Sequence, residues 1–550
     1  MLNVDTPLPR LPTNRKYIVL SARWTRRRSL DTLTDIIDDY LPIVGFNIHR
    51  NSGALQIRFT RDMCKACDEK VAMNEYTLTV GLEIHAELRT RTKMFCDSKN
   101  DSEEVCPNVN VCPICMGHPG TLPVINREAV KHVLRVGLAL GGAIAEFTEF
   151  DRKNYFYPDI PKGYQLSQYE FPIVRGGSLC GVAITRVHLE EDTATSLHEE
   201  GEYSLVNFNR AGVPLMELVT EPVIRSAQEA GNAARELQLL LRYVGASDAN
   251  MEKGEMRVDA NISVSAKTKN QNAKLGTRVE VKNLNSFRAM ERAIEYEFER
   301  QCDLLESGER IVQETRSWDE NVGKTFSQRS KEEAADYRYF PDPDLPKLMI
   351  QGVPDFERGA IQKEMPELPE ARRARYSTLG IKAEDAKTLI ENRSLGELFE
   401  KTAKDLANKE AVLLAVNYLT SDLLGLVKKS GGDADTARFA FTPGAFASLI
   451  RMAWTKKLSS RGTKYILASI FTSGGEPETL AATLGLEQKN DGEELRRVVG
   501  DIIASNTKVA NDYRNGKPAA LQFLVGLGMK ATKGAANPEV LRGIFAELLK

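Results

Sequence analysis

The chain has 550 residues, of which 42% are hydrophobic and 27% charged, and its formal net charge at pH 7 is −2. This composition is ordinary for globular proteins, and the length allows about two to four domains. The small net charge excludes a surface that is basic all over, but not a local basic patch. No uninterrupted apolar run approaches the roughly 18 residues that span a bilayer, so we expect no membrane association. Eight cysteines are too few for a disulfide scaffold.

Residues 1–72 differ in character from the rest of the chain. A basic cluster at 23–28 is followed by four aspartates before residue 40, a pattern typical of neither a transit peptide nor a secretory signal. We expect the functional chain to begin near Met73, with residues 1–72 as a dispensable or mis-assigned extension. Cys64 and Cys67 form a lone C-x2-C without a second pair, so we expect no metal there.

The segment 79–88, TVGLEIHAEL, has the alternation of a β-strand, with apolar residues at every second position. Its other face carries Glu83 and His85, whose positions along a strand are about 7 Å apart, so both side chains could reach one ion. The alternative is an edge strand with a solvated polar face.

The following 260 or so residues mix strand and helix patterns without a regular βαβ rhythm. We therefore predict an α+β domain on an antiparallel or mixed sheet. The predicted helices are 127–140, 226–243 and 287–305, and the predicted strands are 182–191, 256–264 and 277–282.

Three of these strands carry carboxylates beside basic or amide groups. Such faces are costly to bury unless they are paired or bind metal. Together with Glu83 and His85, these carboxylates could form a binding site for Mg²⁺ or Mn²⁺, which prefer oxygen ligands. The alternative is an ordinary solvated face with ion pairs. The residues that share a face are His188, Glu190 and Asp192 in the first strand, Arg257, Asp259 and Asn261 in the second, and Arg278, Glu280 and Lys282 in the third.

Four cysteines lie within 20 residues, at Cys96, Cys106, Cys112 and Cys115. Four thiolates can close a tetrahedral zinc site, and the nearby prolines and glycines indicate a loop that needs such a crosslink. We predict structural zinc. The alternatives are four free thiols, or one thiol spared as a redox group.

Two segments bear on nucleotide binding. Gly323-Lys324-Thr325 resembles the end of a P-loop, but Trp318 stands where the first glycine should be, so we predict an ordinary loop. The segment 151–170 interleaves aromatic residues with cations and amides, which can stack on and hydrogen-bond an unpaired base. The same residues can also simply build a rigid loop.

Beyond the proline-rich stretch 342–346 the chain reads as all helical, with breaks at 430–433 and 472–478. Residues 401–550 contain 21 Lys and Arg against 15 Asp and Glu. This local excess of positive charge would suit contact with a polyanion.

Taken together, these segments resemble the GatB family, the B subunits of aspartyl/glutamyl-tRNA amidotransferases, from about residue 76 to the C-terminus. The motifs that carry the resemblance are VGLEIHAELRTRTKMFC, CPICMGHPGTLPV, DRKNYFYPDIPKGYQLSQYE, HLEEDT, NFNRAGVPLMELVTEP, GTRVEVKNLNSFRAMERAIEYE and DYRYFPDPDLP.

The resemblance implies a particular division of the chain. Residues 1–75 fall outside the match, and 76–355 would be the catalytic cradle domain with a zinc-knuckle insertion at 96–115. Residues 356–475 would be a linker and helical domain, and 476–550 a YqeY-like helical tail, which could alternatively start near 400.

The resemblance also implies an activity. ATP would phosphorylate the side-chain carboxylate of misacylated Glu-tRNA(Gln) or Asp-tRNA(Asn), and ammonia from a partner glutaminase would displace the phosphate. The sequence shows neither a Ser-Ser-Lys amidase constellation nor a P-loop, so glutamine hydrolysis would belong to an A subunit. A small C subunit would complete a cytoplasmic heterotrimer, or an organellar one if residues 1–72 are a genuine leader. The alternatives are a non-catalytic tRNA-binding scaffold and a metal-dependent hydrolase.

Roles follow from the positions of residues in the matching motifs. The Mg²⁺ ligands would be His85, Glu191 and Glu280. The second-tier ligands or ammonia-channel carboxylates would be Glu83, Glu190, Glu217 and Asp259. The phosphate contacts would be Lys153, Arg210 and Lys282. Lys530 and Lys533, in the basic tail, suit contact with the tRNA body, and the alternative for them is a solvated helix face.

The cysteine pattern departs from the usual one in this family, which pairs an early C-x-C with a later C-x2-C. Here Ser98 stands in the second place and Cys106 appears instead. Either Cys106 substitutes as the fourth ligand, or zinc is held by three cysteines or lost.

Overall fold

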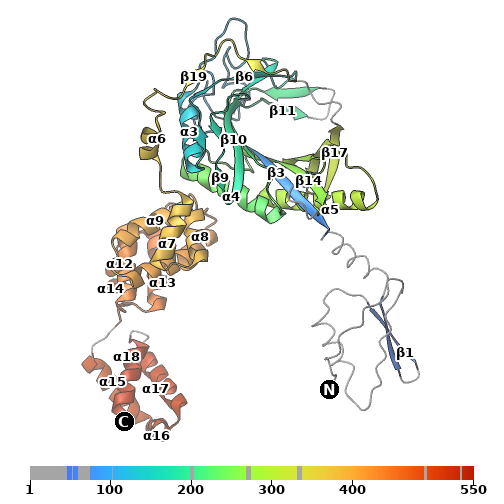
Figure 1. Ribbon diagram of the computed structural model, residues 1–550. Helices are drawn as coiled ribbons and strands as arrows, with labels where there is room; N and C mark the ends of the chain where they lie inside the picture. The colour runs from blue at the N-terminus through green and yellow to red at the C-terminus, as the bar shows by residue number, and fades with distance from the viewer. Residues whose placement is uncertain are drawn as a thin grey trace. The chain divides into compact units, whose positions relative to one another are not determined.

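A computed structural model describes residues 46–51, 54–59, 75–101, 103–198, 203–267, 274–330, 337–488, 492–532 and 536–550. The chain divides into two compact units at Met365 and Pro366, shown in Figure 1. Apart from the antiparallel hairpin of β1 (Phe46–Asn51) and β2 (Ala54–Phe59), the prediction for residues 1–72 lies outside the described residues, as do Cys64 and Cys67.

The first unit is built on a large mixed sheet in which β3 (Tyr76–Glu87) is central. It pairs antiparallel with β13 (Pro214–Thr220) on one side and β14 (Met256–Ala266) on the other. The long path of the sheet runs β17-β16-β15-β14-β3-β13-β10-β7-β6-β18, and of these neighbours only β15 and β16 are parallel. The predicted mixed sheet is confirmed.

The remaining strands of this path are β6 (Asp151–Asn154), β7 (Tyr164–Ser167), β10 (Val182–Glu191), β15 (Val279–Leu284), β16 (Glu314–Asp319), β17 (Lys324–Ser330) and β18 (Phe340–Pro341). Short strands around it are β4 (Ala143–Ile144), β5 (Phe147–Thr148), β8 (Val174–Arg175), β9 (Ser178–Leu179), β11 (Thr195–His198), β12 (Ser204–Asn207) and β19 (Leu348–Met349).

One face of the sheet is apolar and covered by helices. In β3 the side chains of Val80, Leu82, Ile84 and Ala86 are at most 2% exposed. Against this face pack α4 (Ala227–Tyr243) and α5 (Phe287–Glu306), which also contact each other (Figure 1). Because the residues of a strand alternate between faces, the polar residues of β3 must lie on the other side.

The predicted helices and strands are confirmed with small shifts. Strand 182–191 has the predicted bounds, and α3 (Arg127–Ala139) begins at residue 127 with Asn126 as its N-cap. Helices α4 and α5 begin after Ser226 and Ser286, whose hydroxyls accept hydrogen bonds from backbone N–H groups of the first turn. Strand β15 starts two residues later than predicted and ends two later.

The prediction of a loop at Gly323, Lys324 and Thr325 is wrong in part. Gly323 forms the turn between β16 and β17 with φ at 67°, and Lys324 and Thr325 already pair with β16. Both faces of this edge hairpin carry polar residues, so its sequence does not show the alternation of apolar and polar residues that indicates a strand. The segment leads into a strand, β17, and not into a helix, so the inference that it is not a P-loop holds.

The elements named in the second unit are all helices over its described residues. They are α7 (Pro369–Leu379), α8 (Ala383–Glu391), α9 (Arg393–Lys404), α10 (Lys409–Asn417), the π-helix η2 (Tyr418–Leu423), α11 (Leu424–Lys429), α12 (Pro443–Trp454), α13 (Ser460–Ser473), α14 (Pro477–Thr483), α15 (Gly492–Ser505), α16 (Thr507–Arg514), α17 (Pro518–Ala531) and α18 (Pro538–Leu548). The short α6 (Arg358–Glu364) belongs to the first unit. The predicted breaks at 430–433 and 472–478 follow α11 and α13.

One helix in the described part of the chain, Lys409–Lys429, is long and apolar enough to cross a membrane by length and composition alone. It consists of α10, η2 and α11 in succession and contacts α9, α12 and α13 within the helical unit. The Thr420 hydroxyl donates a hydrogen bond to Asp385, which fixes the π-helical turn to α8.

Candidate active site

The register of the sheet gathers ionisable groups of four strands on its uncovered face. His85 of β3 lies directly opposite Glu217 of β13, and Glu217 lies opposite His188 of β10. On the other side of β3, His85 is opposite Arg257 and Glu83 is opposite Asp259 of β14. Directly opposed residues are close enough for their side chains to interact. Residues more than a hundred positions apart therefore form one polar surface.

The edge of this surface toward β15 is tied by specific hydrogen bonds. The Lys282 ammonium donates to Asp259 at 2.7 Å and lies 3.0 Å from a Glu280 oxygen. Glu280 also accepts from the Thr315 hydroxyl at 2.8 Å, and Glu83 accepts from the Asn261 amide at 2.9 Å. These carboxylates are held by neighbours of the opposite charge or by neutral hydrogen-bond donors.

The polar surface forms one wall of a cavity of about 380 Å³. Cationic side chains line it beside the carboxylates, and three tyrosines form a further part of the wall. The ionisable lining residues are Glu83, His85, Lys153, Arg186, His188, Glu217, Asp259, Arg278, Glu280, Lys282 and Glu314.

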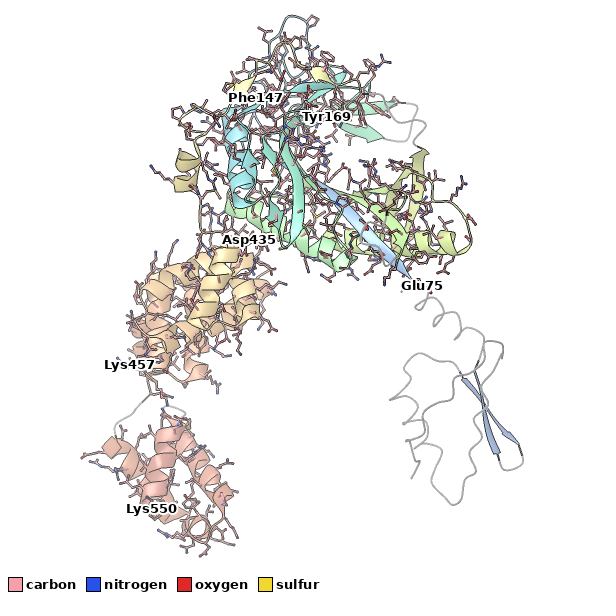
Figure 2. The ribbon with its side chains drawn as sticks, viewed as in Figure 1. Glu75, Phe147, Tyr169, Asp435, Lys457 and Lys550 are labelled. Carbon is pink, nitrogen blue, oxygen red and sulfur yellow. The ribbon has the colours of Figure 1, made fainter. Side chains whose placement is uncertain are left out.

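The three tyrosines come from two segments. Tyr169 and Tyr339 stack with ring centroids 4.1 Å apart and 12° between their planes, and Tyr337 meets Tyr339 edge-on. The Lys153 ammonium lies 5.1 Å from the centre of the Tyr337 ring. Figure 2 labels Tyr169 above the sheet in that view, away from α4 and α5. Segment 151–170 was predicted to stack on a base, and one of its aromatic residues, Tyr169, lines this cavity.

At the centre of the polar surface, three side chains could hold a metal ion. One ligand atom from each of His85, Glu190 and Glu217 lies within 4.8 Å of the other two. The His85 Nε2 atom is 3.4 Å from Glu217 Oε2 and 3.7 Å from Glu190 Oε1. One imidazole and two carboxylates form a donor set that suits Mg²⁺ or Mn²⁺.

The surroundings of these side chains fit a cation. Glu190 Oε2 is buried and has no hydrogen-bond partner among the described residues, and the same holds for His188 Nδ1. An orphaned carboxylate oxygen in a buried site is costly, and an ion beside it would satisfy it.

Electrostatic shifts reflect the crowding of negative charge. Burial, followed by the charge of Glu217, raises the pKa of the Glu190 carboxyl to about 7. Burial opposes the charged form of His85, but its hydrogen bond to Glu217 and the charge of Glu190 outweigh this effect and raise its pKa. Burial lowers the pKa of His188 to about 4, so its imidazole is neutral at pH 7. A divalent cation would offset this crowding of carboxylates.

Glu191, predicted as a magnesium ligand, does not join His85. It follows Glu190 in β10 and therefore points to the opposite face of the strand. Its carboxylate accepts a hydrogen bond from the Leu166 N–H at 2.9 Å and pairs with Lys162. It lines a second cavity of about 210 Å³. The grouping of Glu191 with His85 is corrected to Glu190 with His85.

Glu280 and Arg210 are also placed differently from the prediction. Glu280 lines the first cavity but pairs with Lys282 and Thr315, and it is outside the three-residue group at His85. Arg210, expected at a phosphate, donates to the Thr193 carbonyl at 3.1 Å and lies 3.4 Å from Asp192. It does not line the first cavity.

The sequence interpretation missed Arg186, Tyr337 and Tyr339 as cavity residues. Arg186 has the same strand parity as His188 and Glu190, so the alternation of β10 could have identified it. The two tyrosines lie in a loop segment, whose place beside Tyr169 has no local signal. Glu83, His85, Glu217, Asp259, Lys153 and Lys282 were predicted and do line the cavity.

Three of the four predicted zinc ligands lie together. The sulfur atoms of Cys96, Cys112 and Cys115 are all within 4.8 Å of one another. Cys106 is exposed and is not part of this group, while the Ser98 hydroxyl lies 4.0 Å from Cys115 Sγ. The structure thus does not support Cys106 as the substitute for the missing cysteine of the C-x-C pair.

Comparisons with known proteins identify relatives of this chain. Residues 78–353 match the model of the GatB/GatE catalytic domain, and 397–549 match that of the GatB YqeY domain. A relative from Carboxydothermus hydrogenoformans is 42% identical over 490 residues, covering 87% of this chain and 99% of its own. Relatives from Thermoanaerobacter pseudethanolicus and Crocosphaera subtropica are 42% and 40% identical, covering 86% of this chain and 99% and 98% of their own.

The chain belongs to the GatB family. The three relatives are named as B subunits of the aspartyl/glutamyl-tRNA(Asn/Gln) amidotransferase. The predicted family, the α+β fold with a helical YqeY domain, and the enzyme class of an amidotransferase component are confirmed by this membership. The names of the relatives also agree with a complex of several different chains.

Proposed function

We propose that this chain activates the side-chain carboxylate of Glu-tRNA(Gln) or Asp-tRNA(Asn) with ATP and converts it to the amide. The observation that carries the proposal is the group of His85, Glu190 and Glu217, with a buried orphaned Glu190 oxygen, beside a cavity that His85 and Glu217 line and that also has cationic and aromatic walls. Each wall suits a different part of a nucleotide or of the tRNA end.

His85, Glu190 and Glu217 would hold Mg²⁺. When bound, this ion would neutralise the charge of the transferred phosphoryl group. Lys153, Arg186, Arg278 and Lys282 supply further positive charge around the same cavity, as binding of a triphosphate requires. Glu83 and Asp259 keep Asn261 and Lys282 in fixed positions through hydrogen bonds of 2.9 and 2.7 Å.

The chemistry proceeds in two steps. A carboxylate oxygen of the aminoacyl group takes the γ-phosphoryl group, which leaves ADP and an acyl phosphate. The nitrogen of neutral ammonia then attacks the acyl carbon, a C–N bond forms, the C–O bond to phosphate breaks, and the nitrogen loses a proton. Carboxylates next to the cavity are the groups of this chain that could accept that proton.

The proposed partners rest on the missing amidase constellation and on the excess of positive charge in the second unit. With no amidase constellation in the sequence, ammonia would come from a glutaminase A subunit, and a small C subunit would complete a heterotrimer. The YqeY region at 397–549, with its excess of positive charge, would contact the tRNA body by shape and phosphates. Lys530 lies in the last turn of α17, whereas Lys533 is outside the described residues. The relatives come from bacteria, so the cytoplasm would be the compartment.

The test is co-purification of the chain with its glutaminase partner, followed by assays with γ-labelled ATP on both mischarged tRNAs. We expect ADP formation that depends on the mischarged tRNA and is abolished by Glu190→Gln. Glu128→Gln on the exposed side of α3 is the matched control and should retain activity. Turnover of the substrate without ATP would favour the hydrolase alternative, and complexes active with Glu190→Gln would favour the scaffold.

A further inference from the structure

The strand that carries Glu190, β10, is held differently along its two edges. Toward β13, every residue of 186–191 has a partner in the antiparallel ladder. On the opposite edge, β8 pairs with 186–187 and β7 pairs with Glu190. Among the described strands, the register on this edge therefore has a gap at 188–189, directly before the proposed metal ligand.

Two buried glutamine side chains bind the main chain of β10 at this edge. The Leu189 N–H donates a hydrogen bond to Gln168 Oε1 at 3.0 Å, and Gln165 Nε2 donates one to the Glu191 carbonyl at 2.7 Å. A carboxamide offers both an acceptor and donors, so it can take the place of a neighbouring peptide group. The two bonds hold the residues immediately before and after Glu190, and Glu190 itself lies opposite Ser167.

The amide of Gln168 satisfies only half of its hydrogen-bonding capacity. The residue is 0% exposed, and its Nε2 atom has no hydrogen-bond partner among the described residues. A buried donor without an acceptor offsets much of the stability that the bond of the oxygen provides. Gln168 is therefore a poor residue for stability alone. Its place in the wall of the cavity points to a functional reason for the bond to Leu189.

That reason is the direction of the Glu190 side chain. Glu190 Oε1 lies 3.7 Å from His85 Nε2, and the direction of a side chain in a strand follows the register and twist of its main chain. Groups that bind a metal ion must be held to within about 0.5 Å by the structure around them. Bonds along one edge alone leave a strand free to twist about that edge. The glutamines remove this freedom on both sides of Glu190.

We propose that Gln165 and Gln168 are positioning residues for Glu190. They act through the main chain of Leu189 and Glu191 and keep the Glu190 carboxylate directed at His85. The inference rests on the proposed function, in which Glu190 is a ligand of the metal ion. It assigns a role to two residues of the segment 151–170 other than contact with a nucleotide.

The first test is the Mn²⁺ affinity of the full chain, followed by electron paramagnetic resonance, in the variants Gln165→Met and Gln168→Met. Methionine keeps the approximate length of the side chain and removes the carboxamide. We expect each variant to weaken Mn²⁺ binding about 10-fold, the lower end of the effect of removing a group that supports metal ligands. Kinetics of the assembled complex should show a lower kcat with little change in the KM for mischarged tRNA.

The matched control is Gln238→Met in α4. Gln238 Nε2 donates to the Ala249 carbonyl at 2.7 Å, so this variant loses the same kind of bond far from Glu190 in the sequence. Urea unfolding should show a loss of stability similar to that of Gln165→Met, whereas Mn²⁺ affinity should stay near that of the unmodified chain. Glutamine variants of β7 that weaken Mn²⁺ binding no more than Gln238→Met, while Glu190→Gln weakens it strongly, would overturn the proposal.

A second readout needs no metal. Hydrogen exchange of the Leu189 N–H should be faster in Gln168→Met than in the unmodified chain and unchanged in Gln238→Met. Unchanged exchange in Gln168→Met would also overturn the proposal. If Glu190→Gln leaves Mn²⁺ affinity unchanged, the proposed function is contradicted instead, and the exchange of Leu189 still decides whether the glutamine holds β10.

Discussion

Glu190 and Glu191 are consecutive residues of β10, yet their carboxylates point to opposite faces of the strand and meet different partners. Glu190 Oε1 is 3.7 Å from His85 on the uncovered face of the sheet. Glu191 accepts a hydrogen bond from the Leu166 N–H and pairs with Lys162 beside the cysteine group. The two-residue period of the strand separates their functions, so exchange of one carboxylate for an amide should affect one site at a time.

A first prediction concerns metal binding by this pair. Glu190→Gln removes one of two carboxylates from the group at His85, so we expect Mn²⁺ affinity to fall about 100-fold or more, beyond the effect of residues that only support metal ligands. Glu191→Gln should leave Mn²⁺ affinity near that of the unmodified chain. Titration followed by electron paramagnetic resonance measures both. Equal losses in the two variants would contradict the assignment of Glu190.

Local alternation was sufficient to predict much of this site. It placed Glu83 and His85 on one face of β3, and His188 with Glu190 on one face of β10. The same rule sets Glu191 on the opposite face from Glu190, whereas the prediction of Glu191 as a ligand rested on its position in a motif.

Other features depend on contacts distant in the sequence. The opposition of His85 to Glu217 depends on pairing between strands about 130 residues apart, for which the sequence has no local signal. Cys106 lies in a loop without periodicity, so the sequence likewise has no local signal that it lies apart from the three other cysteines. Tyr337 and Tyr339 reach the cavity through a loop that pairs with β6 at Phe340 and Pro341 and accepts a hydrogen bond from the Asn154 N–H at the Tyr337 carbonyl.

A second prediction concerns the stacked tyrosines. Tyr339→Ala removes one ring of the pair with Tyr169 at the cavity wall, and stacking of a base on an aromatic side chain contributes about 1–3 kcal/mol. We expect nucleotide affinity, measured by titration with a fluorescent ATP analogue, to weaken about tenfold. Tyr157→Ala is the control, since this exposed tyrosine does not line the cavity. An equal loss in both variants would point to a general effect on the fold.

A third prediction concerns pH. His132 of α3 is 4% exposed, its Nε2 lies 2.9 Å from the Arg89 carbonyl, and its Nδ1 lies 3.2 Å from an Arg135 nitrogen. Burial lowers the pKa of this imidazole, so the folded chain keeps it neutral where the unfolded chain is protonated. Stability should therefore fall as pH decreases below the unfolded value of about 6.5, by up to about 1.4 kcal/mol per pH unit.

The measurement for His132 is the midpoint of thermal unfolding between pH 7.5 and 5. His132→Gln keeps a polar group at this position but cannot titrate, so its midpoint should depend less on pH than that of the unmodified chain. Because other groups titrate in the same range, the difference between the two chains is the relevant quantity. Identical pH dependence would show that the imidazole is not held neutral.

A fourth prediction concerns the attachment of the β16–β17 hairpin, which brings Glu314 and Thr315 to the cavity. Glu297 of α5 is fully buried and accepts hydrogen bonds from the Thr325 hydroxyl at 3.0 Å and from Arg300 at 2.6 Å. It also lies 3.7 Å from Arg316. Removing one partner of a buried ion pair costs about 3–5 kcal/mol, because the remaining charge is left uncompensated.

Glu297→Gln keeps the shape of the side chain but loses its charge, so we expect a loss toward the lower end of that range, since Glu314 still pairs with Arg316 at 2.6 Å. Urea unfolding of the chain measures the loss, and hydrogen exchange should show weaker protection in β16 and β17 than in β3. Since Glu280 accepts a hydrogen bond from Thr315 at 2.8 Å, loosening the hairpin should also weaken nucleotide binding. A destabilised chain with unchanged exchange in the hairpin would show that Glu297 stabilises α5 alone.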